Sequence, residues 1–194
     1  MMIRHGMPVK REGSVKDDGH SSSILYRPEK YDILVYNRTS DEIRIHTGTK
    51  GELELYLQKI GQYFLNDPDH FPFTEKYRLD PLRDNGVASL VCNDIPGLEC
   101  VTLLAIFNSF HGDHNRVVMN KATDVFAAIE ESNEQLIPTD ASPLKAIFGL
   151  RISNSKTVRK ITVYPPNVAT YTRDEESPLI EQWLMKRGFI IPPN

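Results

Sequence analysis

Two histidines and an aspartate lie within four positions of one another in the segment FHGDHN, residues 110–115. Imidazole and carboxylate groups are ligands of divalent transition metals, so His111, Asp113 and His114 form a candidate metal site. The same letters also predict a hairpin, with Gly112 and Asp113 as a two-residue loop whose glycine supplies a positive φ. Zinc sites usually have three or four protein ligands. We therefore favour the turn and expect no metal or other cofactor.

The two cysteines, Cys92 and Cys100, would extend the histidines to a four-ligand zinc set. The apolar run at 101–110 argues against this set, because a strand rising about 3.3 Å per residue places Cys100 and His111 roughly 36 Å apart. We expect both cysteines to be small buried side chains without a disulfide framework. This cysteine usage and the polar N-terminal sequence predict a cytoplasmic protein.

Asp32 and Glu42 lie on two successive predicted strands. Restriction-type nucleases hold Mg²⁺ with an acidic residue on one strand and an E-x-K pair on its neighbour, where the lysine positions the attacking water. Position 44 is arginine, which stabilises charge but does not readily exchange a proton. A metal-dependent hydrolase or nuclease, using Asp32 and Glu42 or the turn from His111 to His114, is therefore the alternative function, and no residue is assigned as catalytic.

Other catalytic signatures are missing from the sequence. G-x-S-x-G, G-x-x-x-x-G-K-[ST], G-x-G-x-x-G and C-x-x-C do not occur in it. These patterns belong to hydrolase nucleophile elbows, P-loops, dinucleotide sites and thiol redox sites, respectively. We therefore expect a protein that is not an enzyme.

Basic residues are concentrated near the C-terminus. From Lys145 onward eight Lys and Arg stand against four Asp and Glu, whereas the remaining chain has fifteen against twenty-two. An extended connection with two consecutive prolines follows the densest basic stretch. The candidate binding residues of this region are Lys156, Arg159, Lys160, Tyr171 and Arg173. Because no aromatic residues are interleaved with the basic stretch, binding of nucleic acid is less favoured than binding of protein.

The elements that position these residues begin with a hairpin and a helix. Residues 31–37 and 41–47 are apolar or alternating segments typical of strands. Thr49 and Glu52 have the spacing of a capping box, which predicts a helix start. Apolar residues then recur at helical spacing; they are Leu53, Tyr56, Leu57, Ile60 and Phe64.

The same order occurs twice more along the chain. The predicted strands are 101–110, 115–120, 144–153 and 157–164, and the predicted helices are 123–136 and 177–188. The last helix has Pro178 in its first turn and Gly188 after its end. We predict an α+β fold, mainly an antiparallel sheet built from three β-hairpin–helix units with helices packed on the sheet.

Residues 1–23 contain few apolar side chains and no period, which predicts a mobile or weakly ordered N-terminal arm. Residues 24–194 are expected to form a single α+β domain, with a possible subdivision near 138–143. The chain has no apolar run near the roughly 20 residues of a membrane helix, so we expect no membrane contact.

The expected function is a regulatory, sensory or scaffold module that acts by contact. A protein partner or self-association is expected, and nucleic acid is the less favoured partner. The charge asymmetry and the lack of a convergent catalytic set support this hypothesis.

Overall fold

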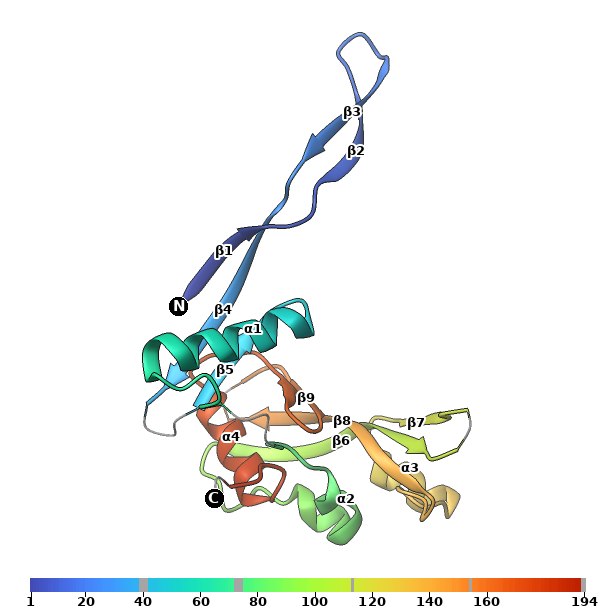
Figure 1. Ribbon diagram of the computed structural model, residues 1–194. Coiled ribbons are helices and arrows are strands. Elements are labelled where there is room, and N and C mark those ends of the chain that lie inside the picture. The colour runs from blue at the N-terminus through green and yellow to red at the C-terminus, as the bar shows by residue number, and fades with distance from the viewer. Residues whose placement is uncertain (39–41, 72–74, 113, 154, 193–194) are drawn as a thin grey trace. The chain divides into compact units, whose positions relative to one another are not determined.

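The computed structural model describes residues 1–38, 42–71, 75–112, 114–153 and 155–192 (Figure 1). The chain forms two compact units, Met1–Phe73 and Thr74–Asn194. The described residues contain antiparallel sheets and helices, which confirms the α+β class. The division between the units falls at residue 73, whereas the sequence placed an arm boundary at residue 23 and a possible subdivision near 138–143.

The N-terminal unit contains β1 (Met2–Gly6), β2 (Lys10–Val15), β3 (Ser21–Tyr26), β4 (Glu29–Asn37), β5 (Glu42–His46), α1 (Lys50–Ile60) and the π-helical turn η1 (Gly61–Leu65). Its three-stranded sheet has the order β1-β4-β5, and β2 pairs with β3. The backbone N–H of Met7 donates to the carbonyl of Pro28 between the two ladders. One long hairpin therefore runs from the sheet to the turn between β2 and β3 (Figure 1).

Residues 1–23, expected as a mobile or weakly ordered arm, supply the strands β1 and β2. Ile3 lies opposite Asp32, and Ser14 lies opposite Ser22. The pairing partners of β1 are far away in sequence, which local composition does not reveal. The mobility of this hairpin stays a prediction.

Helix α1 begins as the sequence predicted. The Thr49 side chain accepts a hydrogen bond from the Glu52 backbone N–H, and the Glu52 carboxylate accepts one from the Thr49 N–H, which is the reciprocal capping box. The predicted inner face is half-buried at Leu53, Tyr56, Leu57 and Ile60. Phe64 is 73% exposed, because the helix changes to a π-turn at Gly61 and its register shifts.

The C-terminal unit contains α2 (Asp80–Asp84), the 3₁₀ helix η2 (Gly86–Leu90), β6 (Leu98–Phe110), β7 (Val117–Lys121), α3 (Val125–Ser132), β8 (Ala141–Ile152), β9 (Arg159–Tyr164), β10 (Val168–Thr170) and α4 (Ser177–Lys186). Its five-stranded sheet has the order β10-β9-β8-β6-β7. Strand β6 is an interior strand, and its nearly continuous apolar sequence is typical of a strand covered on both faces.

An aromatic cluster lies at the centre of the C-terminal unit. Phe148 of β8, Trp183 of α4 and Phe189 are fully buried, and their ring centroids are 5.2 Å apart in each pair. Gly188, at φ 74°, ends α4 in the left-handed conformation and returns the chain to the core. Ile190 then bridges to Tyr77. The apolar C-terminal segment therefore packs within its own unit.

Residues 87–93, VASLVCN, are apolar enough for a strand, but the 3₁₀ helix η2 covers Gly86–Leu90 and turns follow it. A short apolar run does not by itself distinguish a strand from a buried helical turn. Gly86 has φ 53° and starts the helical turn.

Among the described residues, no helix is both long and apolar enough to cross a lipid bilayer.

Candidate functional site

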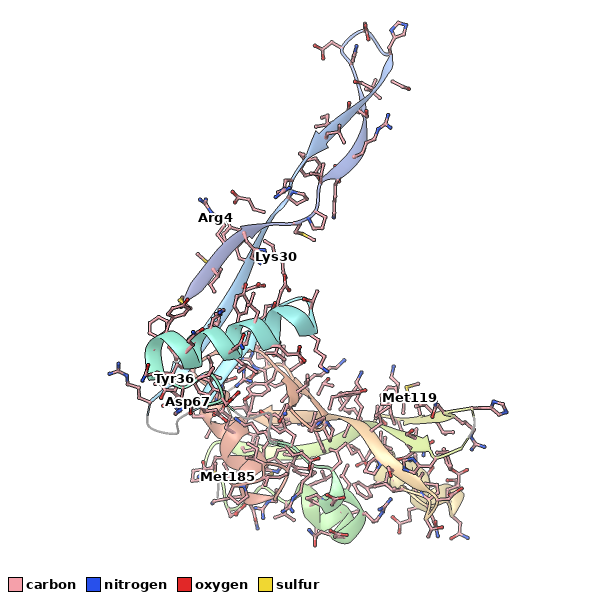
Figure 2. The ribbon with its side chains drawn as sticks, viewed as in Figure 1. Arg4, Lys30, Tyr36, Asp67, Met119 and Met185 are labelled. Atoms are coloured by element: carbon pink, nitrogen blue, oxygen red, sulfur yellow. The ribbon has the colours of Figure 1, made fainter. Side chains whose placement is uncertain are left out.

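A polar cluster lies between the sheet of the N-terminal unit and α1. Alternation along β4 places Lys30 and Asp32 on the same side of the sheet. Glu52 and Tyr56, spaced i and i+4, lie on one face of α1. Figure 2 labels Lys30 on β4 near α1. The fifth member is His5 on β1, a strand that pairs with β4.

Asp32 is the centre of this cluster and its side chain is only 1% exposed. Its Oδ2 accepts a hydrogen bond from the Tyr56 hydroxyl at 2.8 Å and lies 2.9 Å from His5 Nε2. Lys30 Nζ lies 3.4 Å from Oδ1, an ion-pair distance. Oδ1 itself accepts no hydrogen bond from any described residue. A buried carboxylate therefore keeps one oxygen without a hydrogen bond.

The hydrogen bonds of the Glu52 carboxylate also go to only one of its two oxygens among the described residues. Within the described part of the chain its hydrogen bonds go to Oε2, which lies 2.6 Å from Lys30 Nζ and 2.8 Å from Thr47 Oγ1. Thr49 donates to Oε2 as well. Oε1 lies 3.9 Å from His5 Nε2. The capping residue of α1 is thus also a member of the polar cluster.

The electrostatics of the cluster keep both carboxyl groups ionised. Burial raises the pKa of Asp32, but the hydrogen bonds from Tyr56 and His5, together with the Lys30 ammonium beside Oδ1, outweigh burial and lower it to about 2. The hydrogen bond from Lys30, with that from Thr47, lowers the pKa of Glu52 to about 2. Burial and the neighbouring Asp32 raise the pKa of Tyr56 to about 12. At neutral pH Tyr56 is therefore a hydroxyl donor to a carboxylate.

His5, Asp32 and Glu52 each offer one ligand atom, and these three atoms all lie within 4.8 Å of one another. Among the described residues they are the one group of three or more metal-ligating side chains with this spacing. His5 and Glu52 are partly open to solvent, with side-chain exposures of 32% and 26%. The cluster therefore combines one buried carboxylate with two ligand side chains that solvent partly reaches.

The opposite face of the same sheet carries a row of apolar side chains that is uncovered among the described residues. Met2, Tyr31, Ile33 and Val35 alternate with the α1-facing residues, and they are between 47% and 66% exposed. Met2 lies directly opposite Ile33 across the strands. We call these four residues the open apolar stripe. Arg4, Glu42, Arg44 and His46 share this face by register.

The hairpin predicted around Gly112 and Asp113 joins β6 to β7, but its register differs from the prediction. Ser109 pairs with Val117, and the Phe110 N–H donates to the Arg116 carbonyl, so the loop between β6 and β7 is longer than two residues. His111 Nε2 lies 2.8 Å from Ser142 Oγ. Asp113 lies outside the described residues, so the alternative metal site at His111, Asp113 and His114 stays a prediction.

Asp32 and Glu42 do not meet. Glu42 lies opposite Asn37, five residues further along β4, which is roughly 17 Å from Asp32 at the rise of a strand. The carboxylate that does approach the Asp32 site is Glu52, which the sequence singled out only as a capping residue.

Three of the predicted C-terminal binding residues differ in their surroundings, because one forms ion pairs and two are exposed to solvent. Arg159 lies 2.8 Å from Asp174 and 2.7 Å from Glu176. Lys156 and Lys160 are exposed.

The other two C-terminal candidates form one contact network. The Arg173 guanidinium stacks 3.8 Å from the centre of the Tyr171 ring and lies 2.7 Å from Glu181. Tyr171 is 9% exposed and its hydroxyl donates to Glu181. The structure thus brings Tyr171 and Arg173 together within the unit.

The cysteines are only partly as expected. Cys92 is buried and burial raises the pKa of its thiol, whereas Cys100 is exposed, and both are free. Cys100 lies opposite Arg151 near one end of β6, and Phe110 lies opposite Ala141 at the other end. The expectation of a buried Cys100 is wrong, because its side of β6 is not covered at that end.

Comparison with protein-family models, with curated proteins and with solved structures gives no match for this chain. The assignment of a function therefore rests on the geometry of the two units.

Sequence reasoning identified Asp32 but missed the partners His5, Lys30 and Tyr56. A weak signal is present, because Lys30 and Asp32 have strand spacing and Glu52 and Tyr56 have helix spacing. The pairing of β1 with β4, which brings His5 to Asp32, depends on a non-local register that the sequence does not show.

Proposed function

We propose that this protein is a non-catalytic contact module, of a regulatory, sensory or scaffold kind, that associates with a second copy of itself through the open apolar stripe. One observation carries the proposal. Among the described residues of Met1–Phe73, Leu34 is the one large apolar side chain that is buried, whereas fourteen are exposed.

Such a surface is unfavourable in water. Burying apolar area contributes about 25 cal/mol per Å², and contiguous apolar patches on a soluble surface mark sites of contact. Tyr31, Ile33 and Val35 follow one another along one side of β4, and Met2 extends the stripe onto β1. The stripe is therefore a continuous apolar surface rather than scattered residues.

Charges on the same face favour a second copy as the occupant. The stripe is flanked by basic Arg4 and Arg44 and by acidic Glu42, so the face carries both signs. A two-fold axis through the stripe would place stripe on stripe, with the Arg44–Glu42 ion pair of each copy beside it. A strongly single-signed partner is less well matched to this face.

The basic C-terminal quarter provides weaker support for a nucleic-acid partner. Arg159 is paired with two carboxylates, and Arg173 is held by Glu181. The proposal of a contact through this quarter consequently depends on the exposed Lys156 and Lys160.

Sedimentation equilibrium tests the self-association. We expect the wild-type chain to form dimers and Ile33→Glu to weaken the dimer at least tenfold, which is about 1.4 kcal/mol, because a charge would be buried at the stripe. Val117→Glu is the matched control, since Val117 on β7 is 48% exposed and Ile33 is 49% exposed.

The control is expected to associate like the wild type. A wild-type chain that stays monomeric at high concentration, or equal weakening by both substitutions, would contradict the proposal.

A further inference from the structure

We propose that His5, Asp32 and Glu52 bind one divalent transition-metal ion of the zinc type. This site lies on the α1 side of the sheet, so it goes beyond the contact function assigned to the open apolar stripe. The proposal rests on the positions of the ligand atoms, on a buried oxygen without a hydrogen bond and on the contacts that orient the ligands.

The ligand atoms are close enough for one ion. His5 Nε2 lies 2.9 Å from Asp32 Oδ2 and 3.9 Å from Glu52 Oε1, and all three ligand atoms fall within 4.8 Å of one another. Metal–ligand bonds of about 2.0 to 2.2 Å in a tetrahedral site require ligand separations of about 3.3 to 3.6 Å. The two distances from His5 Nε2, 2.9 and 3.9 Å, lie on either side of this range.

Asp32 supplies a second observation. Its side chain is 1% exposed, and Oδ1 accepts no hydrogen bond from a described residue. Buried polar atoms are nearly always hydrogen-bonded, because leaving one without a hydrogen bond costs about 1 to 3 kcal/mol. Oδ1 lies 3.4 Å from the Lys30 ammonium, which also contacts Glu52, so a cation already faces this oxygen inside the cluster. A metal ion that displaces the ammonium would ligate the oxygen directly.

Neighbouring donors hold the ligands as the outer contacts of metal sites do. Tyr56 donates to Asp32 Oδ2, and Thr47 and Thr49 donate to Glu52 Oε2. These bonds leave Glu52 Oε1 toward His5, and they leave Asp32 Oδ1 with the Lys30 ammonium as its neighbour. Contacts of this kind fix the orientation of ligating carboxylates and raise the affinity of a site.

The donor set selects the kind of ion. One imidazole and two carboxylates suit zinc and similar ions, whereas calcium and magnesium prefer oxygen ligands alone. Two carboxylate charges match one divalent ion. The partial exposure of His5 and Glu52 gives the ion a path from solvent and leaves a fourth position for water.

Lys30 is the competitor of this ion. Its ammonium lies 2.6 Å from Glu52 Oε2 and 3.4 Å from Asp32 Oδ1, so it neutralises the same carboxylates. The flexible side chain of Lys30 must turn outward when the metal binds. The proposal therefore predicts that removal of a ligand weakens zinc binding, whereas removal of the Lys30 ammonium tightens it.

Zinc titration of the full-length protein by calorimetry tests this prediction. We expect one equivalent to bind, His5→Ala to weaken binding at least tenfold and Lys30→Met to tighten it at least tenfold. His20→Ala is the matched control, because His20 is an exposed histidine beside Asp18 in the same unit. His114→Ala tests the alternative histidine site. Both of these variants are expected to bind like the wild type.

His5→Gln provides a second variant if His5→Ala does not fold, since glutamine keeps a hydrogen-bonding group but ligates zinc poorly; far-UV circular dichroism checks the fold. Two results would overturn the proposal. One is the absence of saturable binding by both the wild type and Lys30→Met up to about 1 mM zinc, the weak end of specific affinity. The other is binding that survives in His5→Gln and is lost in His114→Ala.

Discussion

Asp32 illustrates how strongly a single residue can organise a unit with little apolar core. The residue as a whole is 0% exposed. Its contacts with His5, Lys30 and Tyr56 join the strands β1 and β4 to helix α1. A buried charge stabilises a fold only when its partners remain, and removal of one partner is costly. The polar cluster, more than packing, therefore fixes how α1 lies on its sheet.

The ionised state of this cluster predicts acid sensitivity. The folded-state pKa values of Asp32 and Glu52 are lowered to about 2, so their contribution to stability is present above the unfolded pKa values near 4. It is lost as the pH falls from about 4.5 to about 2. We expect Glu52→Gln to reduce this pH dependence in the N-terminal unit, as measured by urea unfolding followed by tyrosine fluorescence at several pH values.

Glu54→Gln is the control for this experiment. Glu54 forms an exposed pair with Lys50 on the same helix, with a side-chain exposure of 65%, and such pairs contribute little. An acid profile that is the same in Glu52→Gln and in the wild type would show that the cluster does not carry the pH dependence.

Elements with a local signal could be predicted from the sequence. The capping box at Thr49 and the stop at Gly188 are formed by neighbours in the chain, and both predictions are confirmed. Asp124 caps α3 through neighbours in the same way, whereas Glu176, which precedes α4, makes no side-chain cap. The α+β class follows from these patterns.

Elements that depend on distant residues could not be predicted in the same way. Strand β1 has no strong apolar pattern and is held by β4, and an apolar run with the composition of a strand forms the 3₁₀ helix η2. The candidate site was missed for the same reason, because its histidine is on β1. Asp32 was recognised only because it stands at the start of a clear apolar strand.

Alanine substitutions at Gly51 of α1 and Gly61 of η1 are expected to have opposite effects on the free energy of unfolding. A Cβ at Gly61 would lie 2.3 Å from the backbone oxygen of Asp67, whereas a Cβ at Gly51 would meet nothing within 4 Å. We expect Gly61→Ala to lower the free energy of unfolding by about 1 to 3 kcal/mol and Gly51→Ala to raise it by roughly 0.5 to 1 kcal/mol.

Urea denaturation of the full chain, followed by far-UV circular dichroism, measures both glycine variants. The two substitutions have the same chemistry and lie in one continuous helical segment, so each is a control for the other. Equal effects of the two alanines would refute the close approach of Asp67 to Gly61.

At the scale of the whole molecule, the two units are stabilised differently. The described core cluster, from Tyr77 to Ile190, lies entirely in the C-terminal unit. The N-terminal unit has Leu34 as its buried large apolar residue and depends on strand pairing and the polar cluster. The stability of a small unit follows mainly from the apolar area that it buries.

Separate expression of residues 1–73 and 74–194 tests this difference. We expect residues 74–194 to unfold cooperatively, because Trp183, Phe148 and Phe189 are fully buried within that unit. We expect residues 1–73 to be largely unfolded when dilute and to gain structure at high concentration, because association would cover the open apolar stripe. Denaturation followed by Trp183 fluorescence measures the unfolding of residues 74–194. Circular dichroism over a concentration series measures the structure of residues 1–73. A concentration-independent, cooperative transition of residues 1–73 would contradict a unit that needs a second copy.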